Sequence, residues 1–401
     1  MTSRTGPEPS PFSPGYGRRP LVFGGHDEEL AELTAVFETL DFGENQSVLI
    51  SGLRGAGKTS MLAKLQDSAK DNGWLVISDD ASAGLMDRVM ETAVPTLLSE
   101  LSHEARGRLT GLGIWQLNAQ WEYVDRHREV KPLLRRDLVA LSAELATQRR
   151  PAGLLITIDE VSSGKVRLRE LSRFALEVSH AISEGANVMI VFAGIKVDLD
   201  ALVEQEHTTF LRRSRELDFR RLTPRQTQHV LAESIHIGGK QIEPEALTLL
   251  VTISQGYPYL VQLAGDFAWR SSGSSSTITT ADAHAAHSRA ITAVERRVIS
   301  RVYQDLSDKD QEFVTAMAAD EGGRSKIADI VRRMGVSDQY VQVYKKRLIE
   351  SGYVQADGRG HVVFSLPYLG DYIRSMTAEP SGAPVSDDWG DFPPPSAHAP
   401  A

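Results

Sequence analysis

One short stretch of the chain, Gly52 to Thr59, has the residue types and spacing of a phosphate-binding loop, G-x-x-x-x-G-K-T. Glycines allow backbone N–H groups to turn inward around an anion, and a helix N-terminus adds positive potential. Lys58 is suited to contact the β and γ phosphates of a nucleoside triphosphate, either ATP or GTP, and the Thr59 hydroxyl is suited to bind Mg²⁺. The residues expected at the nucleotide are Gly52, Leu53, Arg54, Gly55, Ala56, Gly57, Lys58, Thr59 and Ser60.

A second set of residues suited to this chemistry is the pair Asp159 and Glu160, which ends the apolar run 154–158. Ligands of open parallel sheets collect at the carboxyl ends of the strands, so we expect Asp159 beside the phosphate loop. There it would complete the Mg²⁺ shell with Thr59, while Glu160 would orient and polarise an attacking water. The alternative is a strand that only happens to end in acidic residues. Glu160 favours hydrolysis over binding alone.

These motifs need strands and helices to position them. Apolar runs predict buried strands at 47–50, 74–78, 154–158 and 187–194. Helical spacing predicts helices between them, at 60–69, 133–148 and 162–185. Strands and helices that alternate in this way predict an α/β fold with a doubly wound parallel sheet.

Two further segments give the chain a family resemblance. Residues 21–30 read Leu-Val-Phe-Gly-Gly-His-Asp-Glu-Glu-Leu, and residues 256–258 read Gly-Tyr-Pro. With the loop and the acidic strand, they resemble AAA+ ATPases of the origin-recognition and archaeal-ATPase type and the related STAND signalling ATPases. His26 departs from the resemblance, since that family usually has Arg there. The resemblance implies a P-loop NTPase core with a helical lid, ATP and Mg²⁺ as cofactors, and adenine contacts from Val22, Phe23 and Pro258.

An arginine-rich stretch is also similar to these ATPases. Arg212, Arg213 and Arg215 precede a short predicted strand. The resemblance implies that an arginine here reaches a γ-phosphate, its own or that of a neighbouring subunit, so the three are expected to be catalytic. A surface cluster paired with local acids is the alternative. The preceding strand lacks the polar residue that senses the γ-phosphate in that family, so Lys196 either substitutes for it or is only solvated.

Residues 305–376 predict a separate domain of three helices and a hairpin, which resembles a winged helix-turn-helix. Double-stranded DNA is the ligand expected at the third helix and the hairpin tip. Residues 306–376 hold ten basic and ten acidic residues, and protein interaction or autoinhibition is the alternative. The expected DNA contacts are Gln342, Lys345, Lys346 and Arg359, with Arg347 on the same helix face.

The composition limits the classes of protein to consider. A net charge of −9 argues against a generally basic nucleic-acid coat, and the absence of cysteine excludes disulfides and thiolate metal sites. No apolar run approaches the roughly 18 residues that a membrane span needs, and the chain starts without an apolar signal core. We therefore expect a cytoplasmic protein without membrane contacts. Trp389 and Phe392 lie among acids near the C-terminus and form either a docking motif or part of a solvated tail.

We therefore predict an α/β protein that acts as a Mg-ATP-dependent switch, hydrolyses ATP slowly or on stimulation by a partner, and associates with DNA. A homo-oligomer is expected in the ATP-bound state. The alternative is a STAND-like signalling regulator whose winged helix binds proteins or inhibits the ATPase. A metabolic kinase that shares only the phosphate loop is disfavoured by the lid motif and the C-terminal domain. The predicted parts are a disordered segment 1–20, a P-loop core 21–222, a lid and linker helix 223–304, a winged helix 305–376 and a disordered tail 377–401.

Overall fold

The computed structural model describes residues 9–15, 18–99, 101, 134–148 and 150–377. Trp115 and Trp121, which we expect in a core, lie outside the described residues, as does the tail with Trp389 and Phe392. No helix within the described ranges is long and apolar enough to cross a membrane.

A five-stranded parallel sheet forms the centre of the N-terminal part, in the order β2-β3-β4-β1-β5. The central strands β3 and β4 are buried on both faces, as their continuous apolar sequences predict. The parallel arrangement and the predicted strands are confirmed. The strands are β1 (Ser47–Gly52), β2 (Leu75–Asp80), β3 (Leu154–Val161), β4 (Val188–Gly194) and β5 (Arg215–Phe219).

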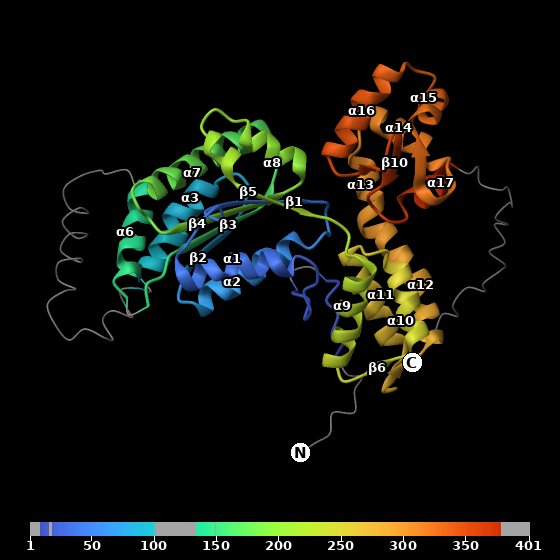
Figure 1. Cartoon of the computed structure of the whole chain (residues 1–401), viewed down its shortest axis with the longest axis horizontal. Helices are drawn as coiled ribbons and strands as arrows, with labels where there is room; N and C mark the ends of the chain where they lie inside the picture. The colour runs from blue at the N-terminus through green and yellow to red at the C-terminus, as the bar shows by residue number, and fades with distance from the viewer. Residues whose placement is uncertain (1–8, 16–17, 100, 102–133, 149, 378–401) are drawn as a thin grey trace, which may run out of the picture.

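Helices cover both faces of this sheet, which makes the predicted doubly wound α/β fold (Figure 1). One face carries α1 (Asp27–Thr39) and α2 (Lys58–Asp71). The other carries α3 (Leu85–Arg88) with the π turn η1 (Val89–Ala93), α6 (Leu134–Ala146), α7 (Lys165–Ser183) and α8 (Lys196–Val203). A 3₁₀ turn, η2 (Thr209–Arg213), leads into β5.

A helical lid follows the sheet. Its first helix begins at a capping box in which Thr223 and Gln226 exchange side-chain and backbone hydrogen bonds. The lid helices are α9 (Pro224–Ile237), α10 (Pro244–Ser254), α11 (Pro258–Ser271) and α12 (Thr280–Val294). Two short parallel strands, β6 (Gln241–Ile242) and β7 (Thr277–Ile278), join their far ends.

The C-terminal part contains the three helices and the hairpin that the sequence predicts, with one more short strand before the second helix. The linker consists of the π turn η3 (Glu295–Ile299) and α13 (Ser300–Asp305). Then follow α14 (Asp308–Ala318), η4 (Glu321–Gly323), β8 (Arg324–Lys326), α15 (Ile327–Met334), α16 (Asp338–Glu350), β9 (Val354–Ala356), β10 (His361–Phe364) and α17 (Leu369–Thr377). The strands form an antiparallel sheet in the order β8-β10-β9.

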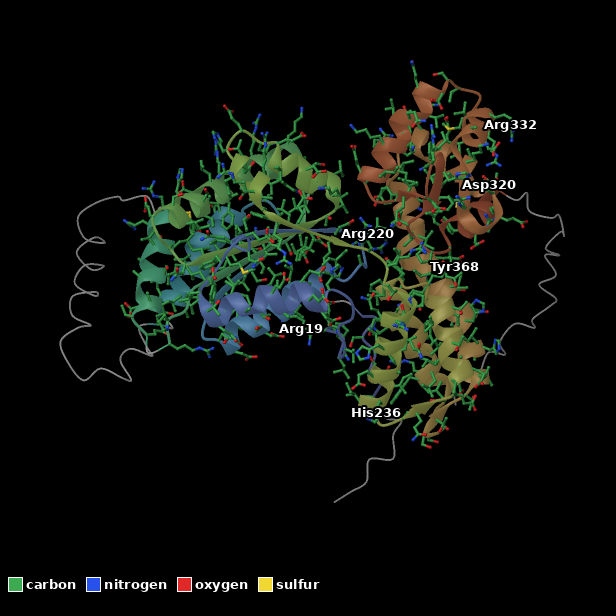
Figure 2. All side chains as sticks on the ribbon, in the orientation of Figure 1. Arg19, Arg220, His236, Asp320, Arg332 and Tyr368 are labelled. Carbon is green, nitrogen blue, oxygen red and sulfur yellow. The ribbon has the colours of Figure 1, made fainter. Side chains whose placement is uncertain are left out.

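Two hydrophobic clusters hold the described parts together. One fills the parallel sheet and its helices, and the other runs through the lid and the C-terminal part without interruption. Tyr368 at the start of α17 joins these last two parts, because its hydroxyl donates to the Ile253 carbonyl at 2.8 Å (Figure 2). The lid and the C-terminal part therefore share a core, whereas the sequence suggested an independent domain.

The N-terminal segment differs from its predicted disorder. Phe12 is buried, and its ring lies against α11 where a Cβ at Gly265 would come within 2.4 Å of it. The Ser13 N–H donates to Gln262 Oε1 at 2.9 Å. The prediction for residues 1–20 is thus wrong for 9–15, because Phe12 finds an apolar site on the lid.

Candidate nucleotide-binding site

A cleft of about 710 Å³ lies where the carboxyl ends of the strands, the lid and the N-terminal segment meet. Its volume is within the range of small-molecule sites. Most of the residues predicted at the nucleotide line it: Arg54, Gly55, Ala56, Gly57, Lys58, Thr59, Ser60, Val22, Phe23 and Pro258. Gly52 and Leu53 instead line a second cavity, toward the C-terminal part.

The loop between β1 and α2 has the backbone shape that its glycines permit. Gly55 and Gly57 have φ values of 76° and 100°, in the left-handed region where other residues are strained. Gly52 is needed for a different reason, since a Cβ there would lie 2.8 Å from the Cβ of Phe219 on the neighbouring strand. The loop ends at the first turn of α2, where backbone N–H groups have no helical partner and favour an anion.

Lys58 lies folded along this loop. Its Nζ donates to the carbonyl oxygens of Gly52 and Leu53 at 2.7 and 2.9 Å. Burial lowers the pKa of the Lys58 ammonium to about 8, against the opposing effect of the Asp159 and Glu160 charges. A half-buried ammonium that donates to neutral carbonyls is suited to take up an anionic group in exchange.

Thr59, Asp159 and Glu160 meet at the edge of the cleft, as the sequence predicts. Thr59 Oγ1 donates to Asp159 Oδ2 at 2.7 Å, and the Glu160 N–H donates to Asp159 Oδ1 at 2.8 Å. Glu160 has a φ of 53° and is exposed, at an irregularity in the pairing of β3 with β4. Backbone strain of this kind is concentrated at functional sites.

The donor set fits Mg²⁺ and disfavours a softer metal. Thr59 and Asp159 offer oxygen ligands, and within the described ranges no group of three or more His, Cys, Asp or Glu side chains forms a metal site. Mg²⁺ keeps several waters and is usually held by one or two protein ligands plus substrate phosphates. These two side chains would therefore suffice when a triphosphate is bound.

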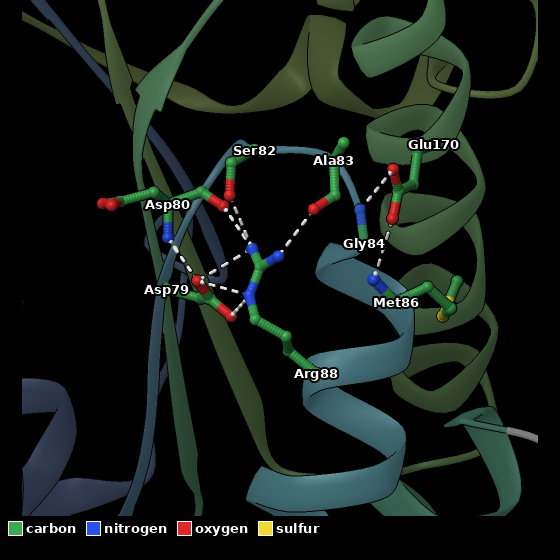
Figure 3. A network of polar contacts seen from close by, with 8 residues as sticks. All are labelled: Asp79, Asp80, Ser82, Ala83, Gly84, Met86, Arg88 and Glu170. Atoms are coloured by element: carbon green, nitrogen blue, oxygen red, sulfur yellow. Dashed lines mark hydrogen bonds and ion pairs between the residues drawn. The ribbon is translucent and has the colours of Figure 1, made fainter.

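A polar network fixes the strand end next to this site (Figure 3). Arg88 holds Asp79 with three hydrogen bonds, from Nε to Oδ1 at 3.2 Å and Oδ2 at 2.9 Å and from Nη2 to Oδ1 at 3.0 Å. Glu170 of α7 accepts two backbone N–H groups at the start of α3, both at 3.1 Å. Asp80 pairs in register with Asp159, and burial, followed by the charges of Asp159 and Asp79, raises the pKa of its carboxyl.

His26 forms a flat wall of the cleft, in the place where the resembling ATPases usually have Arg. Its ring stacks on Phe219 with centroids 3.9 Å apart and planes at 10°, and its Nδ1 lies 3.4 Å from Glu29 Oε1. His26 itself has a φ of 60°, which the ring contact helps to maintain. Sequence reasoning did not find Phe219, because it is only the last residue of a short predicted strand.

The lid motif contacts the phosphate loop directly. Tyr257 is buried, and its hydroxyl donates to the Arg54 carbonyl. The Gly256 carbonyl accepts the Leu222 N–H at 2.7 Å, and Pro258 occupies the first turn of α11. The position of the lid is thereby tied to the conformation of the loop.

Comparison with known proteins agrees with this geometry. Residues 22–191 match the family described as the AAA ATPase domain. They are an AAA ATPase domain. Residues 296–373 match a second family, a domain of unknown function, DUF8462. No curated protein sequence matches the chain.

Solved structures extend the likeness beyond the AAA ATPase domain. The Walker-type ATPase PABY2304 of Pyrococcus abyssi is 15% identical, with a TM-score of 0.63, over 89% of this chain and 97% of its own. The ORC2 protein of Aeropyrum pernix, in ADPNP–ADP complexes, is 14% identical, with a TM-score of 0.57, over 91% of this chain and 98% of its own. At such identities the likeness shows the fold, and it confirms the predicted P-loop NTPase core.

The three arginines predicted to be catalytic lie at the amino edge of the parallel sheet, opposite the cleft. Arg215 pairs with Val48, near the amino end of β1, where it forms an ion pair with Glu32 and donates to Asn45 Oδ1 at 2.8 Å. Arg212 and Arg213 come just before it and are exposed. None of the three lines the cleft, so a role at the phosphates of their own site is excluded. A role toward a neighbouring subunit stays a prediction.

Other arginines line the cleft at the phosphate loop. Arg220 directly follows the carboxyl end of β5, at the junction with the lid (Figure 2), and Arg18 and Arg167 reach the same space. The position of Arg220 after the strand was the signal that sequence reasoning missed. Lys196 does not fill the missing sensor position, because its Nζ pairs with Glu216 at 2.9 Å and Asp200 at 3.0 Å.

The residues predicted to contact DNA lie on α16 and the β9–β10 hairpin. Gln342 and Lys346 are exposed, Lys345 is half-buried, and Arg359 is exposed at the hairpin tip. Arg347 is exposed on the same helix, and its Nε also donates to a carboxylate oxygen at the start of α14 at 2.9 Å. Arg347 thus holds two helices together.

Proposed function

We propose that the chain is a Mg-ATP-dependent switch that hydrolyses ATP slowly. The observation that carries the proposal is the 2.7 Å hydrogen bond between Thr59 and Asp159, beside the half-buried Lys58. In this mechanism Lys58 contacts the β and γ phosphates, Thr59 and Asp159 hold Mg²⁺, and Glu160 orients the attacking water. The bound Mg²⁺ supplies neutralising charge at the transferred phosphoryl group.

The charged residues around the cleft support the proposal of slow turnover. Lys196 is engaged by two carboxylates away from the cleft, so no sensor residue follows β4. Arg220, whose Nε donates to Asp218 Oδ2 at 2.8 Å, is one candidate within the chain for pairing with the γ-phosphate, and a neighbouring subunit in an ATP-bound oligomer could supply another arginine. We propose adenine rather than guanine as the bound base because residues 22–191 match the AAA ATPase domain family. Val22, Phe23 and Pro258, which line the cleft, would contact this base.

The contacts between the parts support a switch. Tyr257 of the lid donates to the carbonyl of Arg54 in the phosphate loop. Arg221, just after β5, donates to the carbonyls of Ser365 and Phe364 in the C-terminal part at 2.7 and 3.0 Å. A nucleotide that moves the loop would therefore favour one arrangement of lid and C-terminal part over another.

We propose double-stranded DNA as the partner of the C-terminal part, which we interpret as a winged helix. The order of its elements, α14-β8-α15-α16-β9-β10, and the exposed Lys346 and Arg359 support this interpretation.

A second candidate is a STAND-like signalling regulator, and a specific contact favours it. A Cβ added at Gly352, just after α16, would lie 3.2 Å from Leu53 Cδ2 of the phosphate loop. The C-terminal part thus rests against the loop and could restrain it. In this case its partners would be proteins, and DNA would not bind.

Fluorescence anisotropy with a short DNA duplex at increasing salt, in ADP and in a non-hydrolysable ATP analogue, tests the proposal. We expect salt-dependent binding that Lys345→Glu/Lys346→Glu weakens, with a salt slope smaller by about 1 per lost phosphate contact. Lys345→Arg/Lys346→Arg is the matched control that keeps the charge. Absence of salt-dependent binding by the wild type would reject DNA and favour the signalling regulator.

A further inference from the structure

Four arginines line a surface groove on the helical segment that joins the lid to the C-terminal part. The groove has a volume of about 710 Å³, and α12, η3 and α13 contribute most of it. None of the residues that line the groove belongs to the phosphate loop. One of them, Arg301, also borders a small cavity that Arg54 lines. The four are Arg289, Arg296, Arg297 and Arg301.

The groove carries a charge that its surroundings do not neutralise. All four arginines are exposed, and none of them forms an ion pair with any residue that the structure describes. Arg297 and Arg301 are spaced i, i+4, where like charges destabilise a helix. The buried residues Val298 and Ile299 direct the neighbouring arginines outward, and the π turn at 295–299 is a feature frequent at functional sites.

An aromatic surface accompanies the charge. The Arg289 guanidinium lies over the Phe267 ring, 4.6 Å from its centroid, and both residues line the groove. Arginine pairs with carboxylates through two parallel hydrogen bonds and also stacks on aromatic rings. A ligand that suits this groove therefore combines carboxylates with an aromatic ring.

The chain itself contains such a segment. Residues 386–392 read Ser-Asp-Asp-Trp-Gly-Asp-Phe, and residues 378–401 include no Lys or Arg. We propose that the arginine groove is a docking surface for residues 386–392 of the same chain. Three carboxylates would meet the four guanidinium groups, and Trp389 or Phe392 would stack beside Phe267.

The starting point and the length of the tail allow this contact. Tyr372 of α17 packs on Tyr303 of α13, with ring centroids 6.1 Å apart, so α17 lies beside the linker that carries the groove (Figure 1). Asp387 lies ten positions after Thr377, the last residue of α17, and this stretch spans up to about 33 Å. The arginines extend over about 18 Å of helix. A tethered segment also has a high effective concentration, which a free polyanion such as nucleic acid lacks.

Disulfide trapping in the full-length chain tests the docking, since the chain has no cysteine of its own. Ser288 lines the groove, so Ser288→Cys with Ser386→Cys should form an intramolecular disulfide on mild oxidation. Ser274→Cys with Ser386→Cys is the matched control, in an exposed turn away from the groove. We expect the first pair to react at least about tenfold faster, given the effective concentration of a docked segment.

Charge reversal decides whether the arginines cause the contact. Arg296→Glu/Arg297→Glu should slow the 288–386 disulfide to the control rate, and Asp387→Lys/Asp388→Lys in the same chain should restore it. The proposal is overturned if the two cysteine pairs react equally fast, if charge reversal leaves the rate unchanged, or if the disulfide joins two chains. It is also overturned if no disulfide forms and Arg296→Glu/Arg297→Glu abolishes binding of a DNA duplex, since the groove would then be a nucleic-acid surface.

Discussion

Charged residues lie at both edges of the parallel sheet, but those at the carboxyl edge are available to a ligand and Arg215 at the amino edge is paired within the fold. At the carboxyl edge, Lys58 is half-buried against neutral carbonyls and Glu160 has a strained backbone, so charge there is left available for a ligand. At the amino edge, Arg215 is paired with Glu32 and Asn45 and is satisfied within the fold. Strand β5 connects the two, with Arg215 at its start and Arg220 just after its end.

Whether a charged side chain can act on the nucleotide therefore depends more on which end of a strand carries it than on the residue type. Arg215 and Arg220 are five residues apart, which in a strand is about 16 Å. Only Arg220 lines the cleft. The same rule explains why Asp159 and Glu160, at the end of β3, lie beside Thr59.

The largest effect is expected at the carboxyl edge from Lys58→Ala. Loss of the charged contact to the phosphates should weaken ATP binding at least about 100-fold, which corresponds to about 2.7 kcal/mol. Titration calorimetry with Mg-ATP measures this change. Arg215→Ala at the amino edge is the comparison and should bind ATP as the wild type does. Equal losses in the two variants would abolish the distinction between the edges.

Two alanine variants compare the effects of the arginines at the two ends of β5, Arg220→Ala and Arg215→Ala. Arg220→Ala should lower ATP turnover or affinity about tenfold, because it removes a guanidinium from the cleft. Arg215→Ala should leave ATP affinity unchanged and lower the free energy of unfolding by about 1 kcal/mol, since its partner Glu32 is largely exposed. Turnover assays and urea unfolding of both variants separate these outcomes, and an exchange of the two effects would refute the account.

A smaller effect is expected from pH, with opposite signs for binding and stability. The Lys58 pKa of about 8 means that ATP affinity falls about fourfold between about pH 7 and pH 8.5, as the ammonium loses its proton. Because this pKa lies below the ordinary value of 10.5, the unfolded chain binds more protons between these values. The contribution of Lys58 to the free energy of unfolding therefore rises with pH in that window.

Affinity and unfolding measured across this pH range test the assignment. Lys58→Arg keeps its charge throughout and should give a flat affinity profile. A profile in Lys58→Arg as steep as that of the wild type would show that another group titrates.

The parts of the site that follow from local spacing could be predicted from the sequence. The phosphate loop and the carboxylates of β3 each adjoin a strand that an apolar run reveals, and a parallel sheet brings both to one edge. The α/β fold followed from the same alternation of strands and helices.

Contacts between distant segments could not be predicted in this way. The resemblance predicts that the arginines around the start of β5 contact the phosphates. The register of Arg215 with Val48 instead places them at the amino edge of the sheet. The stacking of His26 on Phe219 and the burial of Phe12 on α11 join residues far apart in the chain. Composition alone suggested disorder around Phe12, since a single aromatic residue does not reveal the surface that receives it.

Glu160→Gln tests the central claim, that the carboxyl edge binds Mg-ATP and activates water on it, most directly. ATP affinity and steady-state turnover would be measured side by side for the wild type and this variant. We predict that turnover falls at least about 100-fold, because the base that orients the water is lost, while ATP affinity stays within about twofold. Turnover that persists in Glu160→Gln, or ATP binding lost together with turnover, would contradict the account.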